Sequence, residues 1–196
     1  MTSTSALFDP ATFRAQLQST LDGYAQAFRI DAEVHSLLRR QLAQGDDLHS
    51  RKTYPGHVTT SAIILNETGT KTLLIHHRSL NRWLQPGGHY EVPETLSASA
   101  LREALEETGL KGLRVDPWHA ASQLPVDVDS HVIPARPAKG EPEHVHHDFR
   151  YIVRADEASA MRPDFAEVQG AAWHDLSALE AIAPQTLLNL VRLRTS

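Results

Sequence analysis

Cysteine is absent from the 196-residue sequence. Disulfide bridges, zinc sites built on thiolates and thiol catalysis are therefore excluded. The sequence also lacks a run of about 18 apolar residues, which a membrane-spanning helix needs. At the N-terminus no basic region precedes an apolar run, so no signal peptide is predicted. We therefore expect a cytoplasmic protein without a membrane partner.

An excess of positive charge is missing as well. The 19 Lys and Arg residues are outnumbered by 24 Asp and Glu residues, giving a net charge of −5 and a pI near 6.2. This balance argues against a surface that binds a nucleic-acid polymer by neutralising its phosphates. A hydrophobic content of 41% over 196 residues predicts one globular domain with some additional chain.

The first 50 residues have the pattern of a helical hairpin. Asp9-Pro10 is a typical helix start. Apolar residues then recur every three or four positions, at Phe13, Leu17, Leu21, Tyr24 and Phe28. Asp31 can cap a second helix that ends at Gly45. The hairpin cannot bury its apolar stripes alone, so it must pack on the rest of the chain or on another subunit. We favour a structural role for residues 1–50 over substrate gating or a homodimer contact.

Residues 51–196 are predicted to form the functional domain. The β-branched stretch His57 to Leu65 and the segment Thr72 to His76 predict a hairpin. Further strands are predicted at Leu113 to Ala120, Val126 to Ile133, His144 to Arg154 and Ala171 to Trp173. A closing helix is predicted from Ser177 to Arg194, interrupted by Pro184. This order predicts an α/β fold in which a sheet packs between helices.

A helix rich in glutamate lies at the centre of the chain. Ser97 to Thr108 contains no Gly or Pro, and Gly109 stands where a left-handed cap belongs. Leu101, Ala104, Leu105 and Thr108 share the stripe expected to face the core. Glu103, Glu106 and Glu107 share the opposite stripe, where each like-charge pair costs about 0.2–0.5 kcal/mol. Such a stripe is either a solvated acidic face or a site for a divalent cation.

The loop before this helix favours the cation site. Gly87 and Gly88 let the backbone approach a ligand closely, and Glu94 adds a fourth acid. From Gly88 to Leu110 the spacing of glycines, Glu94, Arg102-Glu103 and Glu106-Glu107 resembles the signature of the Nudix hydrolase superfamily (MutT-like). Ala104 departs from the pattern, which usually has a larger aliphatic residue there. The resemblance covers residues 57–194 and implies an α/β/α sandwich with a mixed sheet. Within the superfamily, Asp129 to Ala135 and Gly140 to His144 resemble a subgroup of bacterial members.

The resemblance implies metal-dependent hydrolysis of a pyrophosphate linkage in a small molecule. The substrate would be a nucleoside diphosphate derivative, such as a nucleotide sugar or an ADP-ribose-like compound, or a nucleoside triphosphate. The alternative is a ligand-binding or regulatory protein of the same fold without turnover. The resemblance also assigns the site: Glu106 and Glu107, with the carbonyl of Gly87, would hold Mg²⁺ or Mn²⁺.

Three further residues of the signature would complete the catalytic group. Glu103 would be another ligand or the base for the attacking water, and Arg102 would hold Glu103 or Glu94 in place. Many family members recruit one more acid from a later loop, for which the candidates are Glu141, Glu143, Asp148 and Glu167.

Twelve histidines are a high number for this length. His144, His146 and Asp148 point to one side of a predicted strand because strand side chains alternate. His57, His76, His89 and His131 lie in neighbouring strands or loops. Three roles are open to these histidines. They would contact substrate phosphates, for which His89, His144 and His146 are the candidates, or they would hold an additional transition metal. The third role is hydrogen bonding within the fold. Trp83, just before the glycines, would stack on a nucleobase or pack in the core.

Overall fold

A computed structural model describes residues 8–163, 165–166 and 168–195 of the chain. Within these residues, eight strands form one mixed sheet with the central order β3-β2-β1-β7-β5. The strands are β1 (Gly56–Asn66), β2 (Lys71–His77), β3 (Arg82–Leu84), β4 (Gly87–His89), β5 (Arg114–Val115), β6 (Asp127–Ile133), β7 (His144–Ala155) and β8 (Val168–Asp175). β1 and β7 pair in parallel over eleven residues, whereas β4 pairs antiparallel with β1 and β6 antiparallel with β7.

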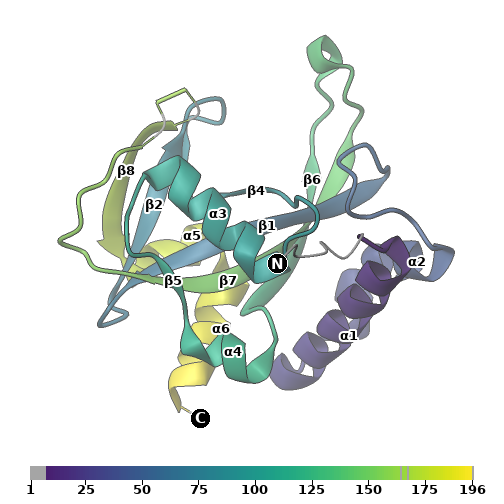
Figure 1. The fold of residues 1–196 in the computed structure, drawn as a ribbon, viewed down its shortest axis with the longest axis horizontal. Coiled ribbons are helices and arrows are strands. Elements are labelled where there is room, and N and C mark those ends of the chain that lie inside the picture. Colours follow the sequence, from purple (N-terminus) through teal and green to yellow (C-terminus); the bar gives the residue numbers. More distant parts are fainter. Residues whose placement is uncertain (1–7, 164, 167, 196) are drawn as a thin grey trace, which may run out of the picture.

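Helices cover both faces of this sheet (Figure 1). They are α1 (Pro10–Phe28), α2 (Ser36–Gln44), α3 (Leu96–Thr108), α4 (Pro117–Ser122), α5 (Leu179–Ile182) and α6 (Pro184–Thr195), with short 3-10 turns at Ala32–His35, Pro137–Lys139 and Leu176–Ala178. Consecutive residues of β1 serve opposite faces: Ala62 and Ile64 pack with α3, whereas Ile63 and Leu65 pack with α5 and α6. The predicted α/β/α sandwich is confirmed.

The N-terminal helices bury their apolar stripe against this same chain. Asp9 caps α1 by accepting from the backbone N–H groups of Ala11 and Thr12, and Gly45 ends α2 at a φ of 81°. The buried stripe of α1 joins one hydrophobic cluster with Phe149 and Tyr151 of β7. The predicted hairpin therefore exists and needs no second subunit to cover this stripe. The division between residues 1–50 and 51–196 stays a prediction.

Three predicted boundaries differ from the structure. The strand predicted from Leu113 to Ala120 is wrong beyond Val115, because Asp116 caps α4 by accepting from Trp118 N at 2.9 Å and Pro117 occupies the first helical position. The short strand at Ala171 to Trp173 extends over eight residues because β8 pairs along β2. A further strand, β3, lies just before Pro86, where none was predicted. Among the helices that the structure describes, none is long and apolar enough to cross a membrane.

Candidate active site

Helix α3 is fixed by both of its ends and by small side chains on its inner face. Thr95 is the N-cap and accepts from Ala98 N at 3.2 Å, and Gly109 ends the helix at a φ of 62°. Ala100 and Ala104 are fully buried toward the sheet. Ala104, the departure from the sequence signature, packs in one cluster with Ala62 and Ile64 of β1.

The predicted division of α3 into an apolar and an acidic stripe is wrong at two positions. Leu105 is 50% exposed, whereas Glu107 is only 5% exposed. The physical reason is a hydrogen bond from another element: the Gly87 N–H group of β4 donates to Glu107 Oε2 at 2.9 Å. A backbone donor beside the helix thus satisfies a buried carboxylate, which would otherwise be costly. Glu107 therefore lies between α3 and β4 rather than on an open face.

The two glycines of β4 leave no room for a side chain, Gly88 on the side of the Glu103 carboxylate and Gly87 on the side of β1. A side chain at Gly88 would place its Cβ 2.5 Å from Glu103 Oε2, and one at Gly87 would collide with the Ser61 hydroxyl. Glycine lets the strand approach α3 this closely. The predicted role of the Gly87 carbonyl as a metal ligand stays a prediction; the contact seen is made by its N–H group.

Arg102 joins three of the predicted carboxylates. Its Nε donates to Glu94 Oε2 at 3.1 Å, and its Nη1 donates to Glu103 Oε1 at 2.9 Å and to Glu106 Oε2 at 3.1 Å. Its Nη2 also donates to the carbonyl oxygen of His89 at 3.2 Å. Although burial opposes the charged form, the hydrogen bond to Glu94 and the charge of Glu103 raise the pKa of Arg102. The guanidinium therefore stays charged and holds the acids in one group.

This group has the composition of a site for a hard divalent cation. Three carboxylates, those of Glu94, Glu103 and Glu106, accept from the Arg102 guanidinium, and the Gly87 N–H group binds a fourth, that of Glu107. The Glu106 side chain is 58% exposed and that of Glu103 13%, so the oxygens range from open to enclosed. Carboxylate oxygens are the ligands that Mg²⁺ and Mn²⁺ prefer, and a cation would relieve the excess of negative charge.

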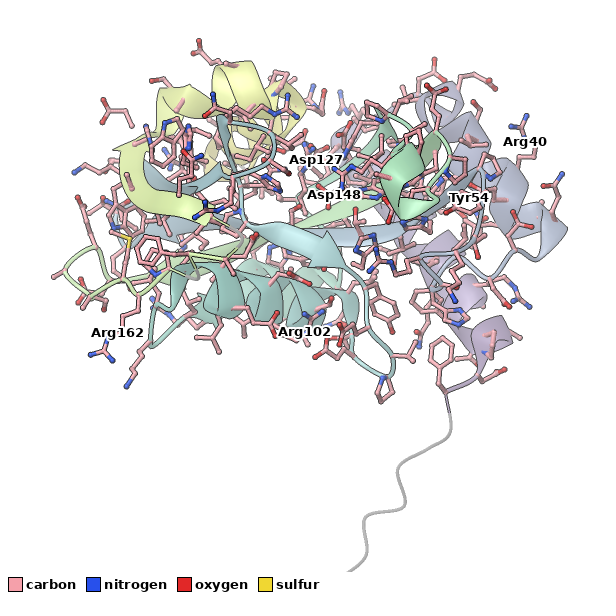
Figure 2. The ribbon with its side chains drawn as sticks, turned by 90° about the horizontal axis from the view of Figure 1, so that it is seen from above. Arg40, Tyr54, Arg102, Asp127, Asp148 and Arg162 are labelled. Atoms are coloured by element: carbon pink, nitrogen blue, oxygen red, sulfur yellow. The ribbon has the colours of Figure 1, made fainter. Side chains whose placement is uncertain are left out.

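The candidate acids from later in the chain have other partners. Asp148 is buried on the face of the sheet opposite α3, where Ser61 Oγ and Arg150 Nε donate to it at 2.8 and 3.0 Å (Figure 2). Glu141 pairs with Arg51 at 3.3 Å. Glu143 is exposed, and Glu167 lies outside the described residues. Asp148 is thus committed to a buried ion-pair network, whose other acids are Asp127 and Asp129.

The sequence pattern did not predict this ion-pair network. Arg150 is almost fully buried and reaches Asp127 at 3.0 Å and Asp129 at 2.8 Å. A signal for it exists in the alternation of Asp127 with Asp129 and of Asp148 with Arg150, which puts each pair on one face of its strand. The carboxylates and guanidinium hold one another in a buried position.

Trp83 packs against two imidazoles. Its ring meets that of His76 at a centroid distance of 5.1 Å and that of His174 at 4.7 Å, both edge-on. It also contacts the core beneath α5 and α6. Its predicted stacking on a nucleobase stays a prediction. Trp118 and Trp173 are partly buried against the core clusters, in agreement with packing roles.

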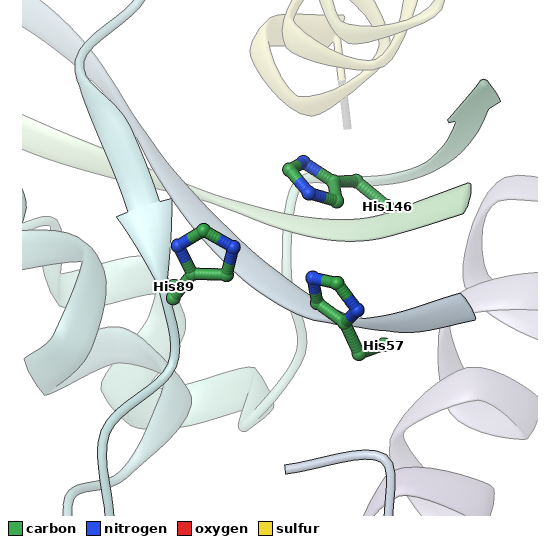
Figure 3. A group of neighbouring side chains, drawn as sticks. All are labelled: His57, His89 and His146. Atoms are coloured by element: carbon green, nitrogen blue, oxygen red, sulfur yellow. The ribbon is translucent and has the colours of Figure 1, made fainter. Parts of the chain in front are cut away.

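The histidines separate into two groups. His119 and His147 are bonded within the fold, His119 to Ile152 N and Leu124 O and His147 to Gln41 and Ser130. His57, His89 and His146 instead converge from β1, β4 and β7 (Figure 3). This second group lies on the face of the sheet opposite α3, because His57 alternates with Val58 and Thr60, and Thr60 contacts Ser99 of α3.

The comparisons with known proteins agree with this architecture. The model of the NUDIX domain matches residues 55–192. A zebrafish (Danio rerio) protein named m7GpppN-mRNA hydrolase NUDT17 is 31% identical over 163 residues, covering 78% of this chain and 49% of that protein. A Lactococcus lactis protein named probable DHNTP pyrophosphohydrolase is 33% identical, covering 53% of this chain and 57% of that protein. The chain spans about half the length of the curated relatives it matches.

A solved structure supports the fold alone. A C. elegans Ap4A hydrolase superposes with a TM-score of 0.52 at 16% identity, covering 70% of this chain and 97% of that one. The expected placement in a bacterial subgroup is not supported, because the relatives include vertebrate proteins.

Proposed function

The chain belongs to the Nudix family, and from this premise we propose that it is a metal-dependent hydrolase of pyrophosphate linkages. One observation carries the proposal: Arg102 gathers Glu94, Glu103 and Glu106 beside the Glu107 carboxylate that Gly87 binds. A binding protein without turnover, the alternative, has no need of three acids gathered around one arginine beside a fourth acid.

The roles within this group follow from position. Glu103, Glu106 and Glu107, with the Gly87 carbonyl, would hold Mg²⁺ or Mn²⁺. When bound, such an ion neutralises phosphate oxygens and lowers the pKa of a bound water. Glu103 would serve as ligand or as the acceptor of the water proton, since its Oε2 lies beside Gly88 while Oε1 is bonded to Arg102. Arg102 positions Glu103 and, through Glu94, the loop before α3.

The substrate we propose is a small nucleoside diphosphate derivative, a nucleotide sugar or ADP-ribose-like compound, or a nucleoside triphosphate. The net charge of −5 favours a small molecule over a polymer. The names of the relatives widen the set of compounds to test, because one refers to an mRNA cap and the other to DHNTP. We also propose a cytoplasmic location, where such nucleotide derivatives occur. Light scattering would test whether the chain forms a homodimer.

Substrate contacts by Trp83, His89, His144 and His146 form part of the proposal. The backbone of His89 adjoins the carboxylates, because its carbonyl oxygen accepts from Arg102, while its imidazole faces His57 on the other side of the sheet. An additional transition metal at the imidazoles would compete with this use of the histidines.

The test is release of phosphate or nucleoside monophosphate from a panel of pyrophosphate compounds with Mg²⁺ and then Mn²⁺. The panel holds ADP-ribose, nucleotide sugars, nucleoside triphosphates, dinucleoside polyphosphates and a methylated cap dinucleotide. We expect turnover of at least one compound, lowered by a factor of roughly 10²–10³ in Glu106→Gln and Glu107→Gln if each supplies an essential ligand. Glu180→Gln, on the exposed side of α5, is the control. No turnover with either metal, or undiminished turnover in both variants, would refute the proposal.

A further inference from the structure

Three imidazoles, one buried and two partly buried, converge on one point on the face of the sheet opposite α3. One ring nitrogen from each of His57, His89 and His146 lies within 4.8 Å of the other two. They come from three different strands, β1, β4 and β7 (Figure 3). The pairing of the sheet sets this meeting, because His57 is in register with His146 and the neighbouring Thr59 is in register with His89. The histidines are thus held by the framework of the sheet rather than by loops.

A fourth imidazole adjoins the three. His144 Nε2 lies 3.3 Å from His146 Nε2, and its ring stacks on that of His57 at a centroid distance of 5.0 Å. Two residues apart on β7, His144 and His146 lie on the same side of the strand. The rings of four histidines therefore lie together near the ends of β1, β4 and β7.

The hydrogen bonds fix which nitrogens carry protons. The Nδ1 atoms of His57 and His144 lie 3.3 and 2.8 Å from the carbonyl oxygens of Thr53 and Pro142. A carbonyl can only accept, so each Nδ1 must hold the hydrogen and each Nε2 must present a lone pair. A histidine that binds a metal through one ring nitrogen commonly donates the N–H group of its other ring nitrogen to such a carbonyl oxygen.

The Nε2 atom of His57 is left without a partner. His57 is 1% exposed, and within the described part of the chain no hydrogen bond reaches its buried Nε2. A buried acceptor without a partner is unfavourable, because it has given up its hydrogen bonds to water. A cation among the four rings would remove this cost.

The imidazoles are in the chemical state that binds metals. Burial lowers the pKa of His89 to about 4 and that of His146 to about 2, and it lowers the pKa of His57 as well. All three are therefore neutral at pH 7, and neutral imidazole is the form that donates a lone pair to a metal. Two nearby side-chain charges act on both His57 and His89 in opposite directions: the charge of Arg51 opposes a positive charge between them, and that of Glu141 favours it.

We propose that His57, His89 and His146, with His144 as a fourth ligand, bind one transition-metal ion of the zinc class. Imidazole suits Zn²⁺ and its neighbours in the first transition row, whereas Mg²⁺ prefers oxygen. Nitrogens at about 2.1 Å from a tetrahedral ion are about 3.4 Å apart, so small rotations of the rings close the site. The ion is separate from the one at the glutamates of α3, and the site does not rest on the proposed hydrolysis.

The first experiment measures metal content. Protein purified without a His tag is analysed for transition metals by mass spectrometry, and apo-protein prepared with a chelator is titrated with Co²⁺ and followed by visible absorption. We expect one equivalent of transition metal per chain and cobalt bands typical of nitrogen ligation. Zn²⁺ should displace the cobalt, whereas a large excess of Mg²⁺ should not. A protein that binds less than a tenth of an equivalent of either metal would overturn the proposal.

Variants assign the ion to the histidines. His89→Gln and His146→Gln should each lower Zn²⁺ affinity by at least tenfold, with circular dichroism showing that they fold. Glu106→Gln should retain the transition metal, as should His76→Gln, a control that alters a histidine of β2 outside the group. Metal lost from Glu106→Gln but retained in both histidine variants would place the ion at the glutamates and refute the site. If the metal is absent and inorganic pyrophosphate instead shifts the histidine NMR signals, the imidazoles bind phosphate.

Discussion

Gly88 sets the position of Glu103 more strictly than any packed side chain does. A methyl group at this position would lie 2.5 Å from Glu103 Oε2 and 2.6 Å from its Cδ, which no pair of atoms tolerates. The atoms in the way are the end of a flexible side chain, so the strain is relieved by moving the carboxylate rather than the strand. The glycine therefore protects the orientation of a functional group more than the stability of the fold.

We accordingly predict that Gly88→Ala separates activity from stability. The turnover found with the best pyrophosphate substrate should fall by roughly 100-fold, because displacements near 1 Å at a catalytic group have effects of this size. The melting temperature should change by only a few degrees. Gly170→Ala is the matched control, because its Cβ would meet nothing within 4 Å. A Gly88→Ala enzyme with full turnover would show that Glu103 does not need its position next to β4.

At the scale of elements, α1 is tied to the sheet by packing. Leu17 is fully buried in the cluster that includes Phe149 and Tyr151. We predict that Leu17→Ala lowers the free energy of unfolding by about 2–5 kcal/mol, measured by urea denaturation, whereas Gln16→Ala on the exposed side of α1 changes it little. Turnover per folded molecule should be unchanged if the hairpin is structural. A large loss of turnover at full folding would indicate that α1 takes part in substrate binding or gating.

Elements whose signals are local could be predicted from the sequence. The caps at Asp9 and Gly109 act within one helical turn, and the structure places both as expected. Asp31 instead caps the 3-10 turn Ala32–His35 that leads into α2, and Thr95 caps α3. The rotation of α3 could not be predicted in this way. It depends on the Gly87 N–H group, which lies twenty residues away from Glu107 and turns that glutamate inward. Leu105 is left exposed as a consequence.

The same distinction between local and long-range signals applies to the candidate site residues. Arg102, Glu103, Glu106 and Glu107 lie within one helix, so their spacing alone suggests shared chemistry. His57, His89 and His146 were all conspicuous as histidines, but their meeting depends on which strands pair and in which register. Alternation along a strand predicts only the side to which each one points. A pattern of residues therefore identified the candidates, and the topology of the sheet brought them together.

At the scale of the whole molecule, buried histidines link stability to pH. His119 is 4% exposed, its Nε2 accepts from Ile152 N at 2.7 Å and its Nδ1 donates to Leu124 O. Burial lowers its pKa below the ordinary value of 6.5. The folded chain therefore holds His119 neutral, while the unfolded chain takes up a proton below pH 6.5. The stabilisation is complete above pH 6.5 and is lost as the pH falls toward the folded pKa.

We predict that the free energy of unfolding falls with decreasing pH from 6.5 downward, and that His119→Gln makes this slope shallower. Each proton that is no longer taken up on unfolding lowers the slope of the unfolding free energy against pH by about 1.4 kcal/mol per pH unit. Urea denaturation at a series of pH values measures the slope, which is compared instead of the absolute stability because the variant also loses packing. Leu17→Ala removes packing but no titratable group, so it should leave the slope unchanged. Parallel slopes in the wild type and His119→Gln would contradict the prediction.

The three residues of β4 stand between the two groups described above. Gly88 faces Glu103, whereas its neighbour His89 faces His57 on the other side of the sheet. Because side chains alternate along a strand, a slip of one residue in the pairing of β4 with β1 would exchange the two faces. An imidazole would then press on the carboxylates, and the glycine would leave a gap among the other rings. A single insertion or deletion in this short strand would thus damage both proposed sites at once, although they lie on opposite faces of the sheet.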